Sequence, residues 1–101
     1  MALAEITVIP SGTKSPSVSK YVAGAVKILQ QEKGIEYEIT SMGTIVEADL
    51  NTILVVARKM HEAAFAGGVQ RVMTLLKIDD RRDKALSMRG KVESLMVQLE
   101  K

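Results

Sequence analysis

The hydrophobic pattern of this chain switches between the two-residue period of a strand and the three-to-four-residue period of a helix. This alternation limits the folds open to it. Leu3 to Pro10 is predicted to be a first strand, with Ala4, Ile6 and Val8 on one face and Glu5, Thr7 and Ile9 on the other. The other predicted strands are Ile35 to Met42, Thr44 to Glu47 and Val69 to Asp79.

Two amphipathic stripes predict helices between these strands. A helix can begin near Ser15–Pro16, because Ser caps free N–H groups and Pro at the first helical position gives up no hydrogen bond. Its stripe ends before Gly34, a residue suited to a helix C-terminus. The second helix is predicted from Leu50 to about Ala66 after a capping Asp49, and a third from Ala85 to Lys101 with an interruption near Gly90.

This order predicts an α+β fold, a ferredoxin-like βαββαβ sandwich. Its sheet would be antiparallel with four strands, with two helices on one face and a C-terminal helix added. A chain of 101 residues suits a single domain, so residues 1–101 are predicted to form one unit. Its core would span about 3–80 and its helical extension about 85–101.

One face of such a sheet carries no helices. Ile9, Met73 and Leu75 alternate with core positions, so we expect them on that open face. An exposed apolar patch usually marks an interface. The pattern therefore predicts packing between sheets of a closed homo-oligomer.

Composition excludes several classes of function. With no Cys in 101 residues, disulfides, thiol chemistry and Cys-ligated metal sites are excluded. A net charge of +2 and three aromatic residues supply neither a basic surface nor stacking platforms for nucleic acid. The start lacks signal-peptide features, and the longest apolar stretch, Leu50–Ala57, is too short to cross a bilayer. We expect a cytoplasmic protein without nucleic-acid or membrane partners.

Three further features suggest chemistry only weakly. His61 is the single histidine and lies along one helix line with Leu54 and Phe65, which favours a boundary contact. SGTKSPS could receive an anion, but it lacks phosphate-loop spacing and reads more simply as a connection. Asp79, Asp80 and Asp83 could hold a hard cation, although the neighbouring bases favour a salt-bridged turn.

The segment Ser41 to Glu47 (SMGTIVE) predicts a hairpin that exposes backbone groups beside Thr44 and Glu47. Backbone groups can pair with the ring nitrogens of a small heterocycle, and a carboxylate can accept from an amino group. A purely structural hairpin explains the same residues.

Three blocks, PSGTKSPSVSKYV, YEITSMGTIVEADL and GVQRVMTLLKIDDRRDK, resemble the small thiamine-binding protein family from about Thr7 to Lys84. The resemblance implies a ferredoxin-like fold, dimers and then tetramers through sheets, and binding of thiamine or its hydroxymethylpyrimidine portion without catalysis or cofactor. Where the family often has glycine after its T-x-x-E signature, this chain has Ala48. The ligand-binding residues it implies are Met42, Gly43, Thr44, Glu47, Ser15 and Ser17, with no metal site.

Two other functions stay open. The chain can be an interaction or regulatory module whose oligomeric surface is the function. It can also be an enzyme that uses Glu47 or clustered aspartates from neighbouring subunits.

Overall fold

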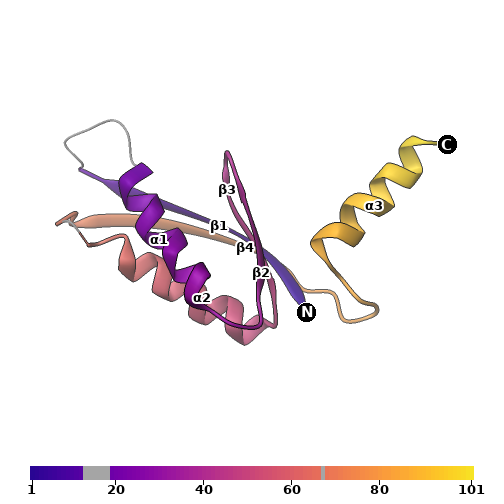
Figure 1. Ribbon diagram of the computed structural model, residues 1–101, viewed down its shortest axis with the longest axis horizontal. Coiled ribbons are helices and arrows are strands. Elements are labelled where there is room, and N and C mark those ends of the chain that lie inside the picture. The colour runs from indigo at the N-terminus through magenta and orange to yellow at the C-terminus, as the bar shows by residue number, and fades with distance from the viewer. Residues whose placement is uncertain (13–18, 67) are drawn as a thin grey trace.

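The computed structural model describes residues 1–12, 19–66 and 68–101, and the described residues fold into one sheet and three helices (Figure 1). In chain order the elements are β1 (Ala2–Ser11), α1 (Ser19–Gln31), β2 (Glu36–Thr40), β3 (Gly43–Ala48), α2 (Leu50–Ala63), β4 (Arg71–Asp79) and α3 (Met88–Leu99). The predicted α+β ferredoxin-like arrangement is confirmed.

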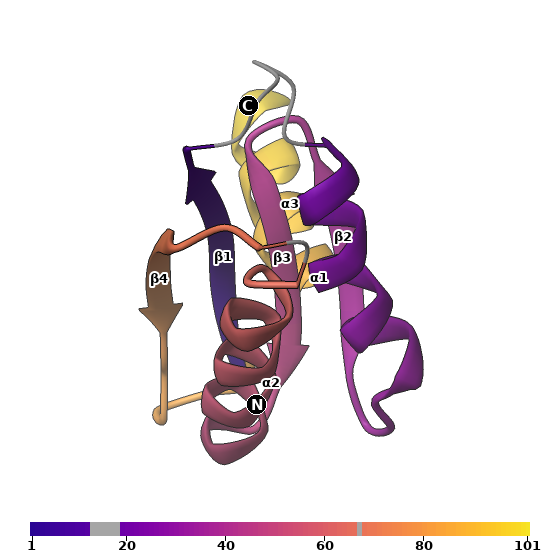
Figure 2. The ribbon, with the colours of Figure 1, turned by 90° about the vertical axis from the view of Figure 1, so that its left-hand side faces the viewer.

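The four strands of the described chain are ordered β2-β3-β1-β4, and every neighbouring pair is antiparallel. Figures 1 and 2 show α1 and α2 on one face of this sheet and α3 on the opposite side, beyond the start of β1. We call the face away from α1 and α2 the open face.

The core lies between the sheet and the α1–α2 layer. Ala4, Ile6 and Val8 of β1 are buried there, as the alternation predicts. Opposite them, Ile53 and Met60 belong to the buried stripe of α2. Burial of such side chains stabilises a fold by roughly 1.5–3 kcal/mol each. This layer therefore fixes the positions of β1 and β3, and Val72 and Leu76 of β4 pack against it.

The predicted exposure of the open face is also confirmed. Ile9, Met73 and Leu75 are 40%, 51% and 52% exposed. In register, Ile9 pairs with Met73 and Thr7 with Leu75, so the three apolar side chains form one patch across β1 and β4. We call it the open-face patch.

The predicted interruption of the last helix near Gly90 is wrong. Helix α3 begins at Met88 and continues through Gly90. Ser87 is its N-cap, and the Ser87 side chain accepts a hydrogen bond from the Gly90 N–H at 2.9 Å. A Cβ at Gly90 would lie 2.8 Å from Ser87 Oγ, so glycine fits the cap and does not break the helix. The predicted start of the first helix at Ser15–Pro16 lies outside the described residues.

Asp49 caps α2 as predicted. Its Oδ1 accepts from the Thr52 N–H at 2.8 Å, and its Oδ2 accepts from the Thr52 hydroxyl at 2.9 Å. The Thr52 backbone N–H, followed by the Thr52 hydroxyl, lowers the pKa of Asp49 below its ordinary 3.8. This contact fixes the first turn of α2 directly after β3.

Replacing Asp49 with Ala should lower stability at neutral pH, because the cap is lost. Since the folded pKa lies below the unfolded one, the stabilisation by Asp49 is present above pH 3.8 and fades as pH falls through the folded pKa. Urea unfolding of the wild type and Asp49→Ala between pH 7 and pH 3 should show the difference shrinking. Asn51→Ala, on the neighbouring exposed residue, is the control. A difference independent of pH would contradict the charged cap.

Candidate functional site

Strand β3 places the two predicted ligand residues Thr44 and Glu47 on opposite faces of the sheet. Thr44 is 4% exposed and points to the same side as the buried Val46. Glu47 is half-buried on the open face, paired in register with Leu3 of β1 and Glu36 of β2. Because successive strand residues alternate, a spacing of three always separates two side chains in this way. Within one subunit, the structure does not bring Thr44 and Glu47 together.

The β2–β3 hairpin is fastened to β1 at Gly43. The Thr7 hydroxyl donates to the Met42 carbonyl at 3.2 Å. A Cβ on Gly43 would lie 2.7 Å from Thr7 Oγ1 and 3.2 Å from the Ile6 carbonyl, so only glycine allows this close approach. Glycine at position 43 therefore serves the backbone packing of the hairpin.

A first cavity, the hairpin cavity, has a volume of about 240 Å³ and lies at the hairpin beside α1. It brings together three of the predicted residues, Met42, Gly43 and Thr44, with apolar side chains of β1 and α1. Its described lining holds no charged side chain. The predicted residues Ser15 and Ser17 lie outside the described part of the chain.

A second cavity of about 240 Å³, the open-face cavity, lies between the sheet and the first turns of α3. Leu3 and Ile45 give it apolar sheet residues, Glu5 and Glu38 give it carboxylates, and α3 contributes an apolar and basic wall. The α3 residues of this wall are Met88, Lys91 and Val92. Sequence reasoning missed this cavity: the alternation of β3 could have indicated Ile45, but nothing in the sequence places α3 against it.

Glu47 holds the N-terminus of α3 beside this cavity. Glu47 Oε1 accepts from the Met88 N–H at 2.8 Å, across 41 residues of sequence. Met88 is the first helical residue, and its N–H has no intrahelical acceptor. A hydrogen bond to a charged group contributes about 1.5–3 kcal/mol. Glu47 is thus the side chain that ties the N-terminus of α3 to β3.

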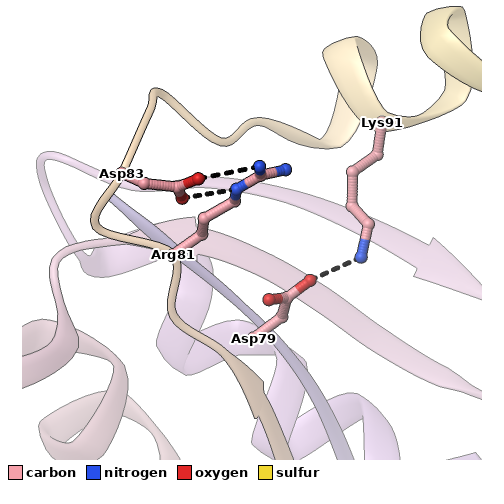
Figure 3. Close-up of polar contacts among 4 residues, drawn as sticks. All are labelled: Asp79, Arg81, Asp83 and Lys91. Atoms are coloured by element: carbon pink, nitrogen blue, oxygen red, sulfur yellow. Dashed lines mark hydrogen bonds and ion pairs between the residues drawn. The ribbon is translucent and has the colours of Figure 1, made fainter.

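Ion pairs surround the same end of α3 (Figure 3). Lys91 pairs with Asp79, and in the connection before α3 Arg81 pairs with Asp83 through two hydrogen bonds. The Asp83 carboxylate raises the pKa of Arg81, and Arg81 lowers the pKa of Asp83. The Asp79–Lys91 pair is about half exposed, and such pairs contribute about 0–1 kcal/mol.

The geometry favours the salt-bridged turn over the metal alternative. Arg82 pairs with Asp80, as Arg81 does with Asp83, so bases occupy the carboxylates that a cation would need. Within the described ranges, no group of three potential ligands is positioned to hold a metal ion.

His61 makes the boundary contact that its position predicts. Its Nδ1 lies 2.7 Å from Thr74 Oγ1, and its ring meets Phe65 edge-on at 5.4 Å. The contact joins α2 to β4. It lies on the helix-covered side, away from the open-face cavity, so His61 has a structural role in the fold.

Comparison with known proteins gives the family. The sequence profile described as thiamine-binding protein matches residues 4–96. The chain belongs to this thiamine-binding protein family. Among its relatives, the UPF0045 protein YqgV of Bacillus subtilis is 46% identical over 99% of both chains. A UPF0045 protein of Methanothermobacter thermautotrophicus is 50% identical over 94% of this chain and 96% of its own length.

Solved structures support the family fold. The hypothetical protein MJ1052 of Methanocaldococcus jannaschii matches with a TM-score of 0.85 and 36% identity, over 93% of this chain and 94% of that one. A Thermotoga maritima protein provisionally assigned to thiamine biosynthesis or salvage has a TM-score of 0.76 and 18% identity. That match covers 93% of this chain and 97% of the other. At that identity the likeness shows the fold alone. Within the described ranges, no helix is both long and apolar enough for a membrane span.

Proposed function

We propose that this protein binds thiamine or its hydroxymethylpyrimidine portion without catalysing a reaction, as a carrier or sensor in thiamine metabolism. Membership of the thiamine-binding protein family carries this proposal. The open-face cavity supports it, because apolar sheet residues and unburied carboxylates together suit a flat ring with an amino group. A cytoplasmic location and a homotetramer stay predictions of the sequence.

Charge favours one of the two cavities as the proposed location of the ligand. Thiamine carries a permanent thiazolium charge, and burying a cation without a partner is costly. The hairpin cavity offers no described carboxylate, and residues 13–18 contain neither Asp nor Glu. The open-face cavity is lined by the carboxylates of Glu5, Glu38 and Asp79 and by Lys77 and Lys91, so acidic side chains outnumber basic ones there. Glu47 lies beside it. We therefore place the ligand on the open face, with the hairpin cavity as the competing location.

The cavity volume sets which part of the ligand enters. Cavities for drug-sized ligands measure about 300–1,000 Å³. The open-face cavity, at about 240 Å³, falls below that range. It suits the single pyrimidine ring stacked over Leu3 and Ile45, with the amino group donating to a carboxylate and the thiazolium left near solvent.

Thermal unfolding with and without millimolar thiamine, its phosphates and hydroxymethylpyrimidine tests the proposal. A ligand at about 100 times its Kd should add about 2.7 kcal/mol, which raises the Tm of a domain this size by several degrees. The pyrimidine alone should suffice for a shift. If none of these compounds changes the Tm, the protein is not a thiamine binder.

Two variants locate the site within this test. Glu47→Gln should weaken binding by about 1–3 kcal/mol, the scale of losing a charged hydrogen-bond acceptor. Thr44→Val, at the hairpin cavity, is the matched control and should leave affinity unchanged. Calorimetric titration measures both. If Thr44→Val weakens binding and Glu47→Gln does not, the ligand binds in the hairpin cavity instead.

A second candidate function is that of an oligomeric interaction or regulatory module, and the open-face patch favours it. Ile9, Met73 and Leu75 lie side by side on the face that α1 and α2 leave uncovered. Two such faces in a symmetric pair would cover each other's patch. This candidate predicts an oligomer whose Tm does not respond to the ligands.

Leu75→Glu should dissociate such an oligomer, because it places a charge within the patch. Light scattering after size-exclusion chromatography measures the mass. Val55→Glu, on an exposed position of α2, is the control and should not change it. A monomeric wild type, or a Leu75→Glu variant that keeps the wild-type oligomer, would contradict packing through this face.

A further inference from the structure

Helix α3 is held by its first turn and by little else. Large apolar side chains on its outer turns are 52–69% exposed, and none of its described residues is buried. Those apolar residues are Val92, Leu95, Met96, Val97 and Leu99. The chain has a radius of gyration of 15.1 Å, whereas a compact domain of this length has about 13 Å, and Figure 1 shows α3 extending from the body.

An isolated helix of this length is marginal in water, since packing of an apolar face supplies most helical stability. Met88 and Val92 line a cavity together with sheet residues. The described polar contacts that tie α3 to the sheet are the Glu47–Met88 hydrogen bond and the exposed Asp79–Lys91 ion pair. Of the two, the bond to Glu47 involves a half-buried carboxylate. The order of α3 therefore depends chiefly on one side chain of β3.

We propose that Glu47 is a latch, and that a ligand taking the Glu47 carboxylate releases α3 from the sheet. This rests on the proposed function, since it makes Glu47 the acceptor for the ligand's amino group. The latched state is the one in this structure, and the released state is the one with ligand bound.

The N-terminus of α3 and the ligand compete for the Glu47 carboxylate because both bring positive charge to it. The N-terminus of a helix carries about half a positive charge, and Met88 presents that end to Glu47. The amino group of the pyrimidine brings N–H donors, with their partial positive charge, to the same carboxylate. Two positive groups beside one carboxylate repel each other.

Release of α3 also removes the limit that the cavity volume sets on the size of the ligand. The sheet residues Leu3, Ile45 and Glu38 stay fixed by strand pairing, whereas the wall of Met88 and Val92 belongs to α3. When α3 leaves, the space above the sheet opens to solvent. It can then accept a two-ring ligand, which the latched cavity of about 240 Å³ is too small to enclose.

Amide hydrogen exchange over residues 88–99 of the full-length protein tests the latch. Glu47→Ala should speed exchange of α3 by at least about tenfold, equivalent to about 1.4 kcal/mol. The matched control is Glu36→Ala, on the strand position paired with Glu47. It should leave α3 exchange as in the wild type. Circular dichroism and exchange of the α2 core check that both variants fold.

Millimolar thiamine should produce the same acceleration in the wild type, in a sample whose Tm is recorded in parallel. If thiamine raises the Tm while α3 exchange is unchanged or slowed, release is wrong and the proposed function stands. If Glu47→Ala exchanges like Glu36→Ala, Glu47 is not a latch. If thiamine leaves the Tm unchanged, the proposed function and the ligand-driven release both fail. The comparison of the two variants still decides whether Glu47 holds α3.

Discussion

The alternation of side chains along β3 is the constraint on which the rest of the structure depends. Thr44 and Val46 enter the core under α2, so Ile45 and Glu47 must face the open side. The same two-residue period gives the sheet one packed face and one bare face. Both cavities beside β3, and the separation of the two signature residues, follow from it.

Glu47 connects this strand to the most weakly packed element of the chain. Its bond to Met88 joins a rigid sheet to a helix without buried residues among those described. A contact of this kind is strong enough to order α3 and weak enough for a ligand to replace. Stable elements thus hold the carboxylate in place, while under the proposed latch the element it holds can be released. A binding protein can signal occupancy through such an arrangement.

Hydrophobic periodicity predicted the strands, the helices of the core and the open-face patch, because burial of alternate residues is a local property of the sequence. The helix cap at Asp49 is also predictable, because capping depends only on residues that are neighbours in the sequence. The position of α3 could not be predicted, since a bond between Glu47 and Met88 spans 41 residues and leaves no local pattern. The predicted helix interruption near Gly90 is wrong because the close contact between Gly90 and Ser87 exists only in the folded cap. The family resemblance implies one site that contains Thr44 and Glu47, whereas the alternation of β3 places their side chains on opposite faces of the sheet.

The central claim is that the pyrimidine ring binds on the open face. Methyl NMR of the labelled protein, titrated with hydroxymethylpyrimidine, tests it directly. The account predicts shifts for Leu3, Ile45 and Val92, which line the open-face cavity, and none for Ile39 and Val26, which line the hairpin cavity. Shifts confined to Ile39 and Val26 would contradict it.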